Sequence, residues 1–268
     1  MRGSGPGLLL AHGAGGGIDA NYGPIMDVLA AGHTVVGPDF PGSGRTPRAD
    51  GPLSLDALAD ELVGAAVEEG VETFALSGFS LGCPVAVRAA VRHPDRVTAL
   101  VLTAGFAHPN PRFLLAARLW RDLLRREDRE GLARLMSLIG LSAPAVDALS
   151  QDELDAAVRT GAATLPPGTP EHVELIMEGV DVRGDLPALA VPTLVISTTL
   201  DQLVTPPHHR ELADGIAGAR YAEIATGHLP FLERPQEWAA LIHDFLEQRR
   251  PQESSTAATA SISTSWSW

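Results

Sequence analysis

Ser80 is the residue whose type and setting most clearly predict chemistry. It is the centre of the sequence Gly-Phe-Ser-Leu-Gly at positions 78–82, which follows a short apolar run and precedes a helix-period segment. This context places the serine on a tight, strained strand-to-helix turn, where glycines on both sides let the strand and the helix approach each other. The helix amino terminus behind the serine favours developing negative charge. We therefore predict a nucleophilic hydroxyl at the carboxyl edge of a sheet.

Asp201 and His228 each follow a predicted strand, and the chain order is Ser80, Asp201, His228. Because the carboxyl ends of parallel strands meet at one edge of a sheet, both side chains should come close to the serine. His228 would take the serine proton and later return it to the leaving group, while Asp201 would hold the imidazole tautomer and stabilise the imidazolium. A loop-capping aspartate and a surface histidine are the alternative interpretations.

The run His-Gly-Ala-Gly-Gly-Gly at positions 12–17 directly follows the first predicted strand. A flexible turn there can aim backbone amides at a carbonyl oxygen, so we expect the amides of Ala14 and Leu81 to form an oxyanion hole. A phosphate-binding loop is the alternative, but the run lacks the dinucleotide spacing and the lysine of a P-loop. His12 is expected to stabilise the turn.

Three residues next to the catalytic candidates predict the walls of a substrate pocket, namely Phe79, Leu229 and Pro230. Their apolar character favours a small or medium ester with an apolar acyl part, and leaves a thioester or a lactone open. The histidine pair at 208–209 does not predict a metal site, because adjacent residues of a helix point to different faces. We expect that pair at a solvated helix start, and no metal site elsewhere.

Short apolar runs alternate with helix-period segments, which predicts an α/β fold with a mostly parallel, doubly wound sheet. The runs are continuous rather than alternating, so helices should cover both faces. Ser54 is expected to cap a helix that begins at Leu55. The six predicted strands are Gly7–Ala11, Thr34–Pro38, Thr73–Ser77, Val97–Thr103, Pro192–Ser197 and Arg220–Ile224.

The chain is predicted to contain a core in two pieces, residues 1–107 and 185–250. Strand signals disappear between them, and residues 108–184 are expected to form an inserted helical lid broken at Gly140, Pro144 and 166–168. Residues 251–268 are rich in Ser, Thr and Ala and are expected to be a disordered tail.

The formal charge of −13 disfavours nucleic acid and anionic lipid as partners and favours a small molecule. The sequence contains no lysine, which excludes mechanisms that need a lysine base or a Schiff base. The single cysteine, Cys83, cannot form an internal disulfide. The apolar run Leu8–Ala11 is too short for a signal peptide or a membrane span, so we expect a cytoplasmic protein.

With these motifs, residues 7–250 resemble the α/β-hydrolase family, in its lid-bearing branch of esterases, lipases and peptidase-like hydrolases. Two further segments carry the resemblance: 36–44 is similar to the family's loop after its fourth strand, and 231–235 to its approach to the final helix. The resemblance implies a serine nucleophile, no cofactor and a lid that selects the substrate.

Two features depart from the family pattern. The family usually has a β-hairpin before the strand that leads to His-Gly, whereas only six residues precede Gly7 here. An unpaired sheet edge would follow, covered by an upstream extension or by a second subunit in a homo-oligomer. The second departure is Ser-Thr-Thr at 197–199, where the family commonly has a glycine, in the loop that carries Asp201.

The resemblance leaves several reactions to weigh. Ser80 excludes relatives with a carboxylate nucleophile, and the lack of lysine excludes plant-type hydroxynitrile lyases. Carbon–carbon hydrolases of the meta-cleavage type carry a tryptophan after the catalytic histidine, where this chain has Leu229. We predict a serine hydrolase that cleaves a carboxylic ester through an acyl-enzyme. The alternatives are a carbon–carbon hydrolase and a non-catalytic ligand-binding or regulatory protein.

Overall fold

The computed structural model describes residues 1–248, in which six parallel strands form a single sheet. The strand order across the sheet is β2-β1-β3-β4-β5-β6. All six predicted strands are present, with ends that differ from the prediction by at most two residues. They are β1 (Gly7–Ala11), β2 (Thr34–Val36), β3 (Phe74–Phe79), β4 (Val97–Thr103), β5 (Thr193–Thr198) and β6 (Arg220–Ile224). The predicted tail at 251–268 lies outside the described residues.

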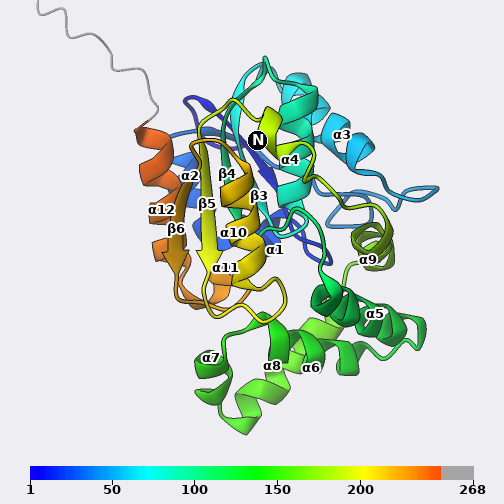
Figure 1. Ribbon diagram of the computed structural model, residues 1–268. Coiled ribbons are helices and arrows are strands. Elements are labelled where there is room, and N and C mark those ends of the chain that lie inside the picture. Colours follow the sequence, from blue (N-terminus) through cyan, green and yellow to red (C-terminus); the bar gives the residue numbers. More distant parts are fainter. Residues whose placement is uncertain (249–268) are drawn as a thin grey trace, which may run out of the picture.

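Helices cover both faces of the sheet, as the continuous apolar strands predict (Figure 1). On one face lie α3 (Leu55–Glu68), α4 (Gly82–Arg92) and α10 (Pro206–Gly215); on the other lie α1 (Ile18–Tyr22), α2 (Met26–Ala30) and α12 (Pro235–Glu247). Three short helical elements complete the core: η1 (Gly23–Ile25), η2 (Leu186–Ala188) and α11 (Pro230–Glu233).

The strands fill the interior with apolar side chains on both sides. In β1, Leu9 packs into the cluster below α3 and α4, whereas Leu8 and Leu10 pack into the cluster below α2 and α12. All six residues of β3 are buried. Burial of each such leucine stabilises the fold by about 2 kcal/mol.

Ser54 caps α3 as predicted, since its Oγ accepts a hydrogen bond from the Ala57 amide.

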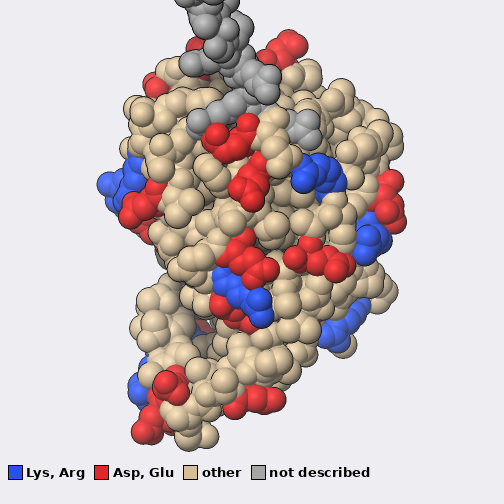
Figure 2. All heavy atoms as spheres, turned by 90° about the vertical axis from the view of Figure 1, so that its left-hand side faces the viewer, with Lys and Arg blue, Asp and Glu red and all other residues tan. Residues whose placement is uncertain are grey.

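Between β4 and β5 the described chain is helical, apart from the turns and loops that join the helices. Its elements are α5 (Pro111–Arg125), α6 (Arg129–Gly140), α7 (Ala143–Asp147), α8 (Gln151–Ala163) and α9 (Thr169–Glu178). Figure 1 shows α5 to α8 beyond the edge toward which the arrowheads of β5 and β6 point. They form the narrower lower lobe in Figure 2, where arginines and carboxylates are interspersed over the visible face. We call residues 111–178 the helical insertion.

The outer edge of β2, expected to be unpaired because the segment before β1 is short, is paired in part by that segment. Arg2 and Val35 form an antiparallel bridge and exchange two backbone hydrogen bonds, of 2.9 and 2.7 Å. The first residues of the chain thus turn back along the edge and satisfy part of it. Among the described residues, no helix combines the length and the apolar character needed to cross a bilayer.

Candidate active site

Ser80 occupies the sharp turn between β3 and α4 and has a left-handed backbone, with φ +53°. Only glycine adopts this region without strain, so a serine there is held by its surroundings. The flanking glycines are required by close packing. A Cβ on Gly78 would come 2.5 Å from the Gly82 carbonyl oxygen, and one on Gly82 would come 2.1 Å from that of Ala11. The turn therefore has the backbone that the motif predicts.

Ser80, His228 and Asp201 form one hydrogen-bonded chain. The Ser80 hydroxyl donates to Nε2 of His228 over 2.9 Å, and Nδ1–H of His228 donates to Oδ2 of Asp201 over 2.7 Å. Each of the three residues is at least nine-tenths buried. Segments up to 148 residues apart thus meet at the carboxyl edge of the sheet. In this arrangement the imidazole is oriented to remove the proton from the hydroxyl.

Four donors surround the carboxylate of Asp201. Its Oδ1 accepts from the amides of Leu203 and Val204, both at 2.9 Å, while its Oδ2 accepts from the Thr198 hydroxyl as well as from His228. Thr198 lies in the segment 197–199, where the family commonly has a glycine. The Thr198 hydroxyl helps to orient the Asp201 carboxylate.

The loop 12–17 lies beside Ser80 and presents the Ala14 amide. The amides of Gly13 and Gly15 donate to the side chains of Asn21 and His172, respectively. Within residues 1–248, the amides of Ala14 and Leu81 have no hydrogen-bond acceptor. Two free amides next to a nucleophile are what an oxyanion hole requires.

A cavity of about 360 Å³ opens onto Ser80 and His228, between the sheet edge and the helical insertion. Phe79 and Leu229 line it as predicted, whereas Pro230, though buried, is not among its described lining residues. Pro230 instead begins α11. Most other walls are apolar and come from the insertion and from α11: Phe113, Trp120, Leu132, Ala133, Met136, Leu165, Ile176, Phe231 and Leu232.

The histidine pair in α10 is not solvated, contrary to the expectation from the sequence. His208 is 3% exposed and His209 is fully buried, and the latter accepts or donates a 2.9 Å hydrogen bond at Nδ1 with the Ser197 hydroxyl. Its Nε2 lies 4.0 Å from Oδ2 of Asp201. His209 faces β5, against which α10 packs, whereas the His208 ring contacts Phe113 and the Asn110 amide of the α5 start. Among the described residues, no cluster of side chains suitable for a metal ion is present.

Buried neutral histidines should make the fold sensitive to acid. Burial lowers the pKa of His12 and of His209 from 6.5 to about 4. Between these two values an unfolded chain binds protons that the folded chain does not, so the free energy of unfolding should fall as the pH falls from about 6.5 toward 4. The expected loss is on the order of 1 kcal/mol per pH unit for each ring.

Urea denaturation between about pH 7 and pH 5 measures this dependence. A His209→Gln variant has one titrating ring fewer and should show a shallower dependence on pH, whatever its stability at neutral pH. An unchanged slope would contradict the assignment of His209 as a buried neutral ring.

The structure brings three further residues to the site to which the sequence gave no role. Asn21 and His172 hold the amides on either side of Ala14. Glu233 accepts hydrogen bonds from the amides of Gly227 and Ser142, and so links the loop before His228 to the helical insertion. The resemblance at 231–235 pointed to Glu233, whereas nothing in the local sequence marked His172.

Comparison with known proteins agrees with this geometry. A model of the alpha/beta hydrolase fold matches residues 6–235, and the chain belongs to this family. It is 35% identical over 248 residues to pyrrolizixenacetamide deacetylase of Xenorhabdus hominickii, covering 92% of each chain. It is 30% identical over 258 residues to 2-hydroxymuconate semialdehyde hydrolase of Pseudomonas sp. (strain CF600), covering 92% of this chain and 88% of that protein.

Among solved structures, the enol-lactonase from Burkholderia xenovorans LB400 superposes with a TM-score of 0.80 at 27% identity. The match covers 91% of this chain and 92% of the other. The chain is thus a hydrolase of the α/β fold, and its relatives cleave different kinds of bond.

Proposed function

We propose that this protein is a serine hydrolase that cleaves a carboxylic ester, or a related acyl bond, of a small to medium molecule. The observation that carries the proposal is the hydrogen-bonded chain from Ser80 through His228 to Asp201, which begins at the floor of an apolar cavity. Ser80, His228 and Asp201 are assigned as the catalytic residues. The likeness to an enol-lactonase supports ester-type chemistry for this cavity.

In the first half of the reaction, the Ser80 oxygen attacks the substrate carbonyl while Nε2 of His228 accepts the hydroxyl proton. Asp201 stabilises the resulting imidazolium through the 2.7 Å hydrogen bond to Nδ1. The amides of Ala14 and Leu81 donate to the oxyanion of the tetrahedral intermediate. His228 then gives its proton to the leaving oxygen, and an acyl-Ser80 ester remains. In the second half, His228 activates water, which releases the acid.

The helical insertion acts as a lid in this proposal. Its side chains supply most of the apolar walls that face Ser80, so an acyl group in the cavity would be enclosed between the sheet edge and α5, α6 and α9. The substrate is therefore a small molecule with an apolar acyl part. No cofactor takes part, because each proton and electron pair moves between the substrate, water and the three side chains.

Amide cleavage is the second candidate. The relative that is 35% identical is named a deacetylase of an acetamide. The same residues can perform that reaction if His228 protonates the leaving nitrogen. Carbon–carbon cleavage is less well supported, although a semialdehyde hydrolase is 30% identical, because Leu229 follows His228 where that reaction class carries a tryptophan.

Competition between water and methanol tests the acyl-enzyme. Two butyrate esters with different leaving groups, 4-nitrophenyl and phenyl, should give the same ratio of methyl butyrate to butyric acid, because both pass through one acyl-Ser80 intermediate. A ratio that changes with the leaving group would contradict the mechanism. Parallel assays of 4-nitrophenyl acetate and 4-nitroacetanilide distinguish the ester from the amide candidate.

A further inference from the structure

His172 of α9 connects the helical insertion to two loops of the core. It is fully buried. Its Nδ1 accepts the Gly15 amide over 3.2 Å, and its Nε2 lies 3.0 Å from the Pro41 carbonyl oxygen. We propose that His172 is a positioning residue that sets the Ala14 amide in the oxyanion hole. This inference rests on the proposed serine-hydrolase function.

Only one form of the ring satisfies both contacts. The Gly15 N–H is a donor, so Nδ1 must carry no proton, and the Pro41 oxygen is an acceptor, so Nε2 must carry one. Burial lowers the pKa of His172 and keeps the ring neutral, although the neighbouring Glu171 carboxylate acts in the opposite direction. The ring therefore accepts at one end and donates at the other, which ties the loop 12–17 to the loop after β2.

The Ala14 peptide lies between two anchored neighbours. Gly13 is held from the core side, where its amide donates to Asn21 of α1 over 3.0 Å. Gly15 is held from the insertion side by His172 and has a left-handed φ of +64°. Without the His172 contact, the Gly15 amide loses its acceptor, and glycine permits other backbone conformations at this position. The Ala14 amide would then lose its fixed direction toward the carbonyl oxygen.

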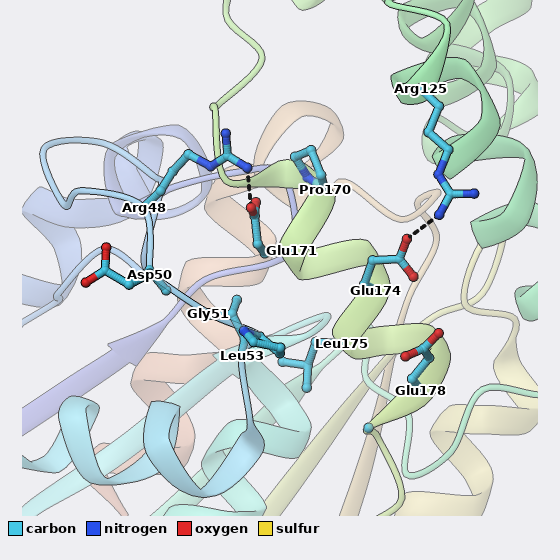
Figure 3. A pocket seen from close by; sticks show the side chains of 13 residues that line it. Arg48, Asp50, Gly51, Leu53, Arg125, Pro170, Glu171, Glu174, Leu175 and Glu178 are labelled. Carbon is cyan, nitrogen blue, oxygen red and sulfur yellow. Dashed lines mark hydrogen bonds and ion pairs between the residues drawn. The ribbon is translucent and has the colours of Figure 1, made fainter.

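The amino-terminal part of α9 is itself fixed to the core. The Gly168 amide donates to the Gly42 oxygen over 2.9 Å, and a Cβ on Gly42 would come 2.3 Å from the Cα of Gly168. Figure 3 shows the ion pair between Arg48 and Glu171, which also joins α9 to the core. His172 therefore links the position of α9 on the core to the position of the Ala14 amide, the proposed donor to the substrate oxygen.

Figure 3 also shows the pair between Arg125 and Glu174, with a distance of 3.1 Å, which joins α9 to α5. Glu174 lies on the same helix as His172 and lines the groove shown in Figure 3, whose described lining includes no residue of the loop 12–17. A Glu174→Gln variant is therefore a matched control that alters α9 without touching the oxyanion hole.

Three substitutions of His172 separate its two contacts. His172→Asn places an oxygen near the position of Nδ1, which can still accept the Gly15 amide. His172→Gln keeps a donor for Pro41 alone, and His172→Phe keeps neither contact. With 4-nitrophenyl butyrate, His172→Phe and His172→Gln should lower kcat about 10- to 100-fold with KM changed less than about threefold, because a misdirected donor weakens binding of the transition state. His172→Asn should keep most of kcat, and Glu174→Gln should retain all of it.

Hydrogen exchange of the peptide that contains residues 12–17 provides the second readout. Exchange should be faster in His172→Phe and His172→Gln than in His172→Asn and the parent protein. Equal kcat for His172→Asn and His172→Gln, in variants that melt at the same temperature, would overturn the role of His172. This comparison stands even if His172→Phe does not fold. Retained activity in Ser80→Ala would instead overturn the proposed function, so the two failures are distinguishable.

Discussion

Replacing Ser80 with alanine should lower the turnover of 4-nitrophenyl butyrate by on the order of 10⁶, the size of effect that removal of an activated serine has in other triad enzymes. The substitution removes the hydroxyl that donates to His228 and leaves the oxyanion amides and the apolar cavity in place. Substrate should therefore still bind. Measurement of kcat and of the binding of a butyrate ester checks both halves of this expectation.

The fold should survive the Ser80→Ala substitution. The amide at position 80 keeps its hydrogen bond to the Thr103 oxygen. The substitution also leaves the close backbone packing at Gly78 and Gly82 unchanged. Thermal unfolding should be nearly unchanged. Full esterase activity in the purified, folded variant would contradict the assignment of Ser80 as the nucleophile.

Replacing Asp201 with asparagine should lower kcat by on the order of 10⁴, because the amide lets His228 adopt the wrong tautomer. The Asp201 carboxylate accepts hydrogen bonds from His228, Thr198 and the amides of Leu203 and Val204. In the variant, an NH₂ group at the position of Oδ2 would face the donors of His228 and Thr198 and could not accept from them. Some loss of stability should accompany the loss of activity, since one buried donor becomes unpaired.

Two other aspartates serve as controls for Asp201. Asp185 pairs with Arg88 at a distance of 3.0 Å, and Asp214 is exposed on α10, so neither contacts His228. Asp185→Asn and Asp214→Asn should keep nearly full activity. Inactivation by either one, with activity retained in Asp201→Asn, would show that the third member of the triad is misassigned.

Local sequence was enough to predict the strands, the turn at Ser80 and the strand ends that carry Asp201 and His228. Each of these depends on a few neighbouring residues: an apolar run, a glycine where a Cβ would clash, or a polar residue directly after a strand. The rule that parallel strands end at one edge then brings the three side chains together without further information. For that reason the candidate triad could be assigned before its geometry was known.

The supporting contacts could not be predicted in this way, because they join segments that are far apart in the chain. His172 reaches Gly15 across 157 residues, and Glu233 reaches Ser142 across 91. They depend on how the helical insertion docks on the core, which no local pattern encodes. The burial of His209 was missed for the same reason, since polar residues at a helix start are usually solvated and only the packing of α10 against β5 turns them inward.

Labelling with a fluorophosphonate, followed by peptide mass spectrometry, tests the central claim most directly. The probe reacts with a serine only where a base activates the hydroxyl and an oxyanion hole receives the phosphonyl oxygen. We predict one adduct per chain, located on Ser80, that is absent in Ser80→Ala and forms far more slowly in Asp201→Asn. Absence of an adduct on Ser80 in the folded parent protein, or labelling of another serine that accounts for the esterase activity, would contradict the account.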